Sequence, residues 1–172
     1  MQLFYIGMAV AIGAGAGAQI AMLGAVGRQK GSLEATWITV LGTIAAAALI
    51  LAVRALRGDD TLLPSPFDRA SRFFAVAALT TVALAFSVRD IDPYYAVMGL
   101  GVLGVVLGAG FLGPRIGVAL FIGAMIAGQL TTGLVLDHIG AFGAQVERAT
   151  LLRTGGGAAL IVGVALVRGG GE

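Results

Sequence analysis

The stretch that decides the fold is IGVALFIGAMIAGQLTTGLVL, residues 116–136. It contains no charged residue and is followed directly by Asp137 and His138. A helix needs about 20 predominantly apolar residues to cross the hydrocarbon core of a bilayer, so this stretch predicts a transmembrane helix. Its residues are apolar on all faces of a helix, which indicates a helix surrounded by lipid or by other helices.

The same pattern recurs along the chain, and charged connectors separate the runs. The other predicted helices cover about 3–26, 33–53, 73–88, 93–112 and 150–167. Membrane β-barrels instead alternate in segments of about 10 residues, which these runs do not. The run 73–88 is the shortest, so a crossing and an interfacial position both stay open for it. The sequence predicts an all-α, polytopic transmembrane helix bundle of five to six helices, as a single domain over 1–172.

Composition supports a membrane protein and excludes other classes. Hydrophobic residues make up 58% of the chain and charged residues 12%, with a mean hydropathy of +0.97, whereas soluble domains carry about 25% charged residues. The chain has no cysteine, so disulfides and cysteine-based metal sites are excluded. A formal net charge of +2, spread over the connectors, does not indicate a nucleic-acid partner.

No enzymatic arrangement of residues is apparent. His138 is the only histidine, and no predicted span holds a pair of carboxylates. A nucleophile–base pair or a metal triad therefore lacks its parts. Gly13, Gly15 and Gly17 follow no strand and do not form a dinucleotide-binding fingerprint. We expect no enzyme activity, no cofactor and no metal. The Gly13/Gly17 and Gly104/Gly108 pairs have GxxxG spacing, which favours close helix packing.

Polar residues inside membrane spans are costly and are therefore candidate site residues. Gln19 and Gln129 are predicted to line a central cavity and to bind substrate; hydrogen bonds between helices are the alternative. Trp37 is the third candidate for substrate contact, with interfacial anchoring as its alternative. Glu34 lies two residues after Ser32, the expected N-cap of the second helix. Its carboxylate there interacts favourably with the positive end of the helix dipole. Its alternative role is to bind a coupling ion or proton.

Asp137 and His138 form a polar pair at the end of the fifth predicted helix. The helix dipole disfavours an anion at a helix C-terminus, so a cation should compensate Asp137. His138, Arg148 and Arg153 are the candidates, although Arg153 could equally extend its side chain to the lipid headgroups.

Lysine and arginine are divided almost evenly between the two sides of the membrane. With six crossings, one side receives Arg28, Lys30, Arg89, Arg148 and Arg153, and the other receives Arg54, Arg57, Arg69, Arg72, Arg115 and Arg168. If 73–88 does not cross, the division is four against seven. Because the positive-inside rule then favours neither orientation, we expect the protein to insert in both orientations and to form an antiparallel dimer.

Several short motifs carry a family resemblance. They are Pro93-Tyr-Tyr, GLGVLG at 99–104, GPRIG at 113–117, AGQL at 127–130, LDHIG at 136–140 and Gly-x5-Gly-Val-Ala-Leu at 157–166. More loosely, Gln19, Gly27-Arg28, Gly31-Ser-Leu33 and Gly42-Thr43 agree as well. In this order they resemble the DUF606 (YdcZ-like) family of small bacterial membrane proteins in the drug/metabolite transporter superfamily. The chain departs from that pattern at Leu23, where the family usually has asparagine, and by the extra length around 73–88.

The resemblance implies half of an inverted-repeat transporter fold in the bacterial cytoplasmic (inner) membrane. We therefore expect a small-molecule transporter that works by alternating access as an antiparallel homodimer, with the lipid bilayer and the substrate as its other partners. The alternative is a non-transporting membrane scaffold or accessory subunit. The sequence does not name the substrate, the coupling ion or the direction of transport.

Overall fold

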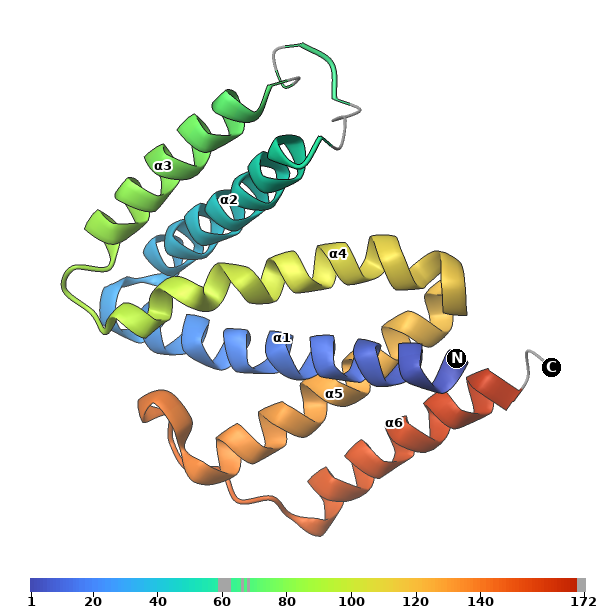
Figure 1. The fold of residues 1–172 in the computed structure, drawn as a ribbon. Coiled ribbons are helices and arrows are strands. Elements are labelled where there is room, and N and C mark those ends of the chain that lie inside the picture. Colours follow the sequence, from blue (N-terminus) through green and yellow to red (C-terminus); the bar gives the residue numbers. More distant parts are fainter. Residues whose placement is uncertain (59–62, 66, 68, 170–172) are drawn as a thin grey trace. The chain divides into compact units, whose positions relative to one another are not determined.

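The protein is helical throughout the residues that the structure describes, which are 1–58, 63–65, 67 and 69–169 of a computed structural model. Its elements are α1 (Gln2–Lys30), α2 (Ser32–Leu56), α3 (Ala70–Ser87), η1 (Pro93–Val97), α4 (Met98–Ile116), α5 (Val118–Ile139), η2 (Ala141–Gly143) and α6 (Leu151–Gly169) (Figure 1). The two η elements are short 3-10 helices, and the described residues contain no strand. Among these described residues, six helical segments are long and apolar enough to cross a membrane. The prediction of an all-α bundle is confirmed.

Two details of the helix ends differ from the sequence prediction. The predicted helix end at about 112 is wrong, because α4 continues through Pro114 to Ile116 and a single residue, Gly117, connects it to α5. Gly117 has a φ of 84°, a conformation that glycine adopts without steric cost. The expected N-cap Ser32 is also wrong: it is the first helical residue, and Gly31, with a φ of 109°, precedes α2.

The chain forms two compact units. The first contains residues 1–25 and 104–172, and the second contains residues 26–103. In the first unit α5 and α6 run side by side in opposite directions (Figure 1). Its core consists of small and large apolar side chains from α1, α4 and α5: Ala9, Leu112, Ile116, Leu120, Phe121 and Ala124.

Within the first unit, α1 and α5 approach so closely that their glycines leave no room for side chains. A Cβ added to Gly13 would collide with the carbonyl oxygen of Met125, and one added to Gly17 would lie 2.7 Å from the carbonyl oxygen of Gln129. The contact is reciprocal, since a Cβ on Gly128 would collide with the backbone of Val10. The Gly13/Gly17 pair thus packs as its spacing predicts. In the second GxxxG pair, a Cβ on Gly108 would meet α1 and α5 side chains, but one on Gly104 would meet no atom within 4 Å.

The second unit is built on the antiparallel pair α2 and α3 (Figure 1). Gly42 and Gly99 pack backbone to backbone, and the Thr43 hydroxyl donates a hydrogen bond to the Gly99 carbonyl oxygen at 3.1 Å. At the end of α3, the Lys30 ammonium donates to the Ser87 carbonyl oxygen at 3.4 Å and lies 3.5 Å from the Asp90 carboxylate. Lysine at a helix C-terminus is favourable, so α3 ends at the level where α2 begins.

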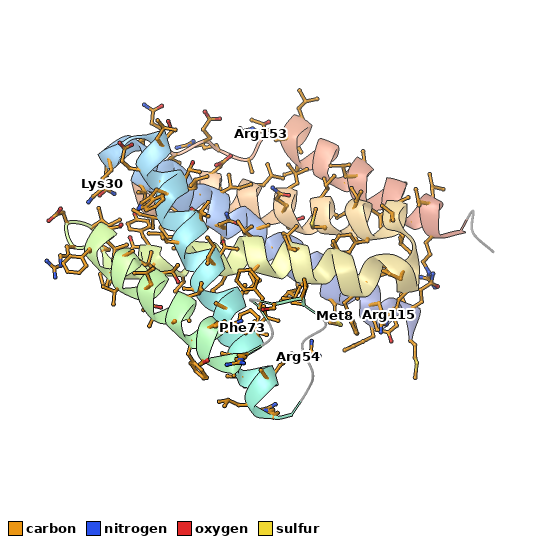
Figure 2. All side chains as sticks on the ribbon, turned by 90° about the horizontal axis from the view of Figure 1, so that it is seen from above. Met8, Lys30, Arg54, Phe73, Arg115 and Arg153 are labelled. Carbon is orange, nitrogen blue, oxygen red and sulfur yellow. The ribbon has the colours of Figure 1, made fainter. Side chains whose placement is uncertain are left out.

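Charged side chains lie at the ends of the helices within each unit. Figure 2 shows Arg115 and Arg153 at opposite ends of the first unit, and Lys30 and Arg54 at opposite ends of the second. Between these ends, large apolar side chains such as Leu79, Val106 and Val135 are more than half exposed. Such an apolar band suits the hydrocarbon core of a bilayer.

The glycine contact between α1 and α5 predicts a position-specific loss of stability. Gly13→Ala should lower the free energy of unfolding by about 1–3 kcal/mol, because the new methyl group must push two backbones apart. Gly15→Ala is the matched control, since a Cβ there meets no atom within 4 Å and alanine is the better helix former. Unfolding in mixed detergent micelles, followed by circular dichroism, measures both. Equal stability of the two variants would contradict the packing.

The length of α3 predicts a crossing. Its 18 residues span about 27 Å at about 1.5 Å per residue, close to the roughly 30 Å of the hydrocarbon core. Arg57 and Asp92, on either side of α3, should then lie on opposite sides of the membrane. In a double cysteine variant of this cysteine-free chain, a membrane-impermeant thiol reagent should label one site per molecule in intact cells and both after permeabilisation.

Mass spectrometry of the labelled protein gives the number of labels on each molecule, and this number does not depend on which way the molecule is inserted. Doubly labelled protein from intact cells would show that α3 lies at the interface instead.

Candidate functional site

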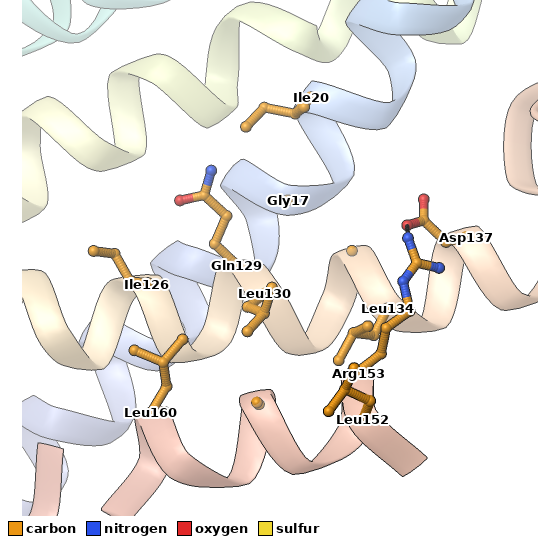
Figure 3. A pocket seen from close by; sticks show the side chains of 13 residues that line it. Gly17, Ile20, Ile126, Gln129, Leu130, Leu134, Asp137, Leu152, Arg153 and Leu160 are labelled. Carbon is orange, nitrogen blue, oxygen red and sulfur yellow. Dashed lines mark ion pairs between the residues drawn. The ribbon is translucent and has the colours of Figure 1, made fainter. Parts of the chain in front are cut away.

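The first unit contains a cavity of about 680 Å³ between α1, α5 and α6 (Figure 3). This volume is within the range of small-molecule sites in proteins, about 300–1,000 Å³. The lining residues are Gly17, Ile20, Ile126, Gln129, Leu130, Gly133, Leu134, Asp137, Leu152, Arg153, Gly156, Gly157 and Leu160. The cavity is thus mainly apolar, with three side chains able to form hydrogen bonds or ion pairs.

The space exists because glycines stand where larger residues would fill it. Gly133 and Gly156 line the cavity, and a Cβ added to either would meet no atom within 4 Å. Beside them Gly157 sits close to α5, since its Cβ would lie 3.4 Å from a Leu134 methyl group. Along the cavity, the α5–α6 pair is therefore in contact at Gly157 and open at Gly133 and Gly156.

Gln129 supplies the polar group in the middle span of α5. The contact of Gly17 with the Gln129 backbone fixes the level of this residue against α1. Its amide carries two donors and one acceptor, and its side chain, which lines the cavity, points away from α6 on the side of α5 where Ile20 lies (Figure 3). The cavity so combines an apolar wall with one central amide.

Charged groups gather at one end of the cavity. The Arg153 guanidinium, in the first turn of α6, lies 2.9 Å from the Glu147 carboxylate and 3.8 Å from the Asp137 carboxylate. Figure 3 shows Arg153 reaching from α6 toward Asp137 at the end of α5. Of the three candidates for compensating Asp137, Arg153 is the one that pairs with it. The guanidinium thereby joins the ends of α5 and α6.

The connector after α5 folds back to build this end. Gly140, Phe142 and Gly143 have positive φ values of 62°, 55° and 72°. The reversal lets the Glu147 N–H donate to the Asp137 carbonyl oxygen at 2.9 Å, which brings the Glu147 carboxylate beside Arg153.

His138 holds the connector from the other side of the turn. The Ala149 N–H donates a hydrogen bond to its Nδ1 at 3.3 Å. Of the polar pair predicted at the helix end, Asp137 thus lines the cavity and His138 contacts the connector.

The other predicted site residues lie elsewhere. Gln19 is half-buried on α1 but does not line this cavity. It stands two residues after Gly17, about 200° around a helix from it, and so faces away from α5. Glu34 and Trp37 belong to α2 in the second unit, where Trp37 is 57% exposed. The Glu34 carboxylate folds back over Gly31 at the start of α2.

Of the two other charged residues at the site, the sequence prediction includes Arg153, as one candidate partner of Asp137, but not Glu147. The deficit of a cation near Asp137 was the one available signal for Arg153. Nothing in the sequence indicates Glu147, because its position depends on the reversal at 140–143.

The arrangement suits reversible binding of a small molecule with an apolar body and a polar group. Aliphatic side chains provide the wall, Gln129 a hydrogen-bonding group, and Asp137 and Arg153 an ionic end. The lining contains no serine, cysteine, histidine or lysine that could act as a nucleophile beside a base.

Comparison with known proteins identifies the family. The family model described as "Putative inner membrane exporter, YdcZ" matches residues 69–166, a range that includes α3, α4, α5 and most of α6. No curated protein and no solved structure matches the chain. The matched range covers more than half of the 172 residues and contains nearly all of the cavity lining. The described residues include six helices long and apolar enough to cross a membrane, and the chain belongs to the YdcZ-like (DUF606) family of the drug/metabolite transporter superfamily.

Proposed function

We propose that the protein is a small-molecule transporter that works by alternating access as an antiparallel, dual-topology homodimer. The observation that carries the proposal is the cavity of about 680 Å³, with a central amide and an ionic end, inside a bundle of membrane helices. Polar groups within membrane spans are costly and typically mark substrate pathways. A protein that only held a partner in place would have no use for such a space.

The even distribution of positive charge supports antiparallel pairing. With α3 as a crossing, lysine and arginine divide five against six between the two sides of the membrane. Neither orientation then has an electrostatic advantage during insertion. Two oppositely inserted copies would be related by a two-fold axis in the membrane plane, as the two halves of an inverted repeat are.

The surface of α6 supports an oligomer as well. None of its described residues is buried, although Leu160, Ile161 and Val162 lie in its middle and Gly155 and Gly163 leave open space beside it. A helix with small residues and an uncovered apolar surface suits close packing against another helix. Since α6 also lines the cavity, a second copy placed there would enclose the substrate.

The residues divide into roles under this proposal. Gln129 binds substrate in the cavity, while Gln19 and Trp37 contribute to the substrate path where the two copies meet. Glu34 is the candidate for binding the coupling ion or proton. Asp137 forms the ionic end with Arg153 and Glu147, and its predicted neighbour His138 holds the connector. Alternating access requires that the two copies tilt against each other and expose this site to each side in turn. The chemistry is transport, not catalysis.

The pairing is tested through orientation. C-terminal fusions to a reporter active in the cytoplasm and to one active in the periplasm should both give activity, because both orientations are populated. Adding three lysines beside Gly58 should make one reporter dominate. A protein that activates a single reporter without added lysines would instead be a parallel oligomer or one half of a hetero-pair.

Transport itself is tested in liposomes loaded with a mixture of small amines, organic acids and neutral alcohols. At least one solute should leave faster than from protein-free liposomes, as measured by mass spectrometry. Gln129→Leu keeps the size of the side chain but removes the amide. It should slow that efflux about tenfold, because losing a polar interaction worth roughly 1.4 kcal/mol lowers an equilibrium or rate constant by about that factor. Absence of efflux for every solute would favour the scaffold function.

A further inference from the structure

We infer that the cavity takes an amphipathic organic cation whose charged group pairs with Asp137. This inference rests on the proposed function, because it names the substrate class of the same site. The argument depends on how the single guanidinium at the ionic end is shared between two carboxylates.

Glu147 is the principal partner of Arg153. The Arg153 Nη2 atom lies 2.9 Å from the Glu147 carboxylate oxygen, which is hydrogen-bonding distance, but 3.8 Å from the Asp137 carboxylate oxygen. At 3.8 Å the second contact is an ion pair without a hydrogen bond. Arg153 is therefore largely neutralised by Glu147, and Asp137 keeps most of its capacity to accept hydrogen bonds and positive charge.

The local charge favours a cation at Asp137. The two carboxylates and one guanidinium carry a net charge of −1, and Arg148, the next residue in the connector, is exposed and does not line the cavity. Asp137 also lies in the last turn of α5, where the helix dipole is unfavourable for an anion. A bound cation would relieve this unfavourable interaction. An anion directed at Arg153 would instead have to displace Glu147 and approach Asp137.

The rest of the cavity specifies the body of the ligand. Ile126, Leu130 and Leu160 provide an apolar wall away from the ionic end, which suits an aliphatic or aromatic group. The Gln129 amide lies on α5 two helical turns before Asp137. It could bind a second polar group at that distance, about 12 Å along the helix at about 1.5 Å per residue.

The test uses three water-soluble probes that share a benzyl group: benzyltrimethylammonium, phenylmethanesulfonate and neutral benzyl alcohol. Binding to the purified protein in a neutral detergent is measured by isothermal titration calorimetry, with protein-free micelles as the blank. The cation should bind at least tenfold more tightly than either other probe. Equal or tighter binding of the sulfonate or the alcohol would overturn the inference.

Substitutions at the ionic end should change the affinity for benzyltrimethylammonium in opposite directions. Asp137→Asn should weaken it at least tenfold, because the partner carboxylate is lost. Glu147→Gln should weaken it severalfold, since Arg153 then turns to Asp137. Arg153→Gln should strengthen it severalfold, because the competing internal cation is removed.

Asp90→Asn is the matched control, because Asp90 also pairs with a basic side chain, Lys30, but lies outside the cavity; its affinity should be unchanged. A merely unfolded or distorted site would weaken binding in all three cavity variants, so the gain in Arg153→Gln is the decisive result. Weaker binding in Arg153→Gln, with a monodisperse profile on gel filtration, would contradict the inference.

Flux measurements separate this inference from the proposed function. If benzyltrimethylammonium binds with the expected pattern but no solute crosses liposomes, transport fails and the cation site stands. If liposomes release an organic acid but not the cation, the protein is a transporter and the inference about its substrate fails.

Discussion

The first unit depends on the absence of side chains at Gly13, Gly17 and Gly128. A single methyl group at any of these positions would collide with, or crowd, the backbone of the facing helix. Membrane helices gain little from expelling lipid, so close van der Waals contact between their backbones provides much of their association energy. The contact also sets the level of α5 against α1 and thereby places Gln129 beside the cavity. The helix packing and the position of Gln129 at the cavity therefore both follow from the lack of side chains at these three glycines.

The ionic end obeys a second constraint, the cost of charge near hydrocarbon. Asp137 is half-buried at the end of α5, whereas Arg153 and Glu147 are exposed, and the guanidinium pairs with both carboxylates between α5 and α6. The reversal at 140–143, with three positive φ values, is what makes the third partner available. Because one guanidinium serves two carboxylates, the site retains an excess of negative charge. An exporter could use this excess to select its substrate, which would make the structural ion pair a part of recognition.

Sequence reasoning identified Gln129 and Asp137 as site residues, and the structure places both in the cavity. Both residues stand out in the sequence because a polar residue in an apolar span, or an anion at a helix C-terminus, is energetically unfavourable. Gln19 is also a polar residue in an apolar span, but it lies on the side of α1 that faces away from α5 and so does not line the cavity. Glu147 does not stand out in this way, since it lies in an ordinary polar connector. The predicted helix 93–112 stops four residues before the end of α4 at Ile116, because proline is disfavoured inside a helix and the sequence does not show that α4 continues through Pro114 to the turn at Gly117.

The sequence by itself determined that the chain is a bundle of membrane helices, because long runs without charge can satisfy their backbone hydrogen bonds in lipid only as helices. It also indicated the packing at Gly13 and Gly17 and the family. Only the tertiary structure decided which glycines touch and which leave space, as Gly128 and Gly133 differ in their neighbours and not in their chemistry. It alone joined Arg153 to Asp137 and Glu147, because that contact requires two helix ends and a folded connector to meet in three dimensions.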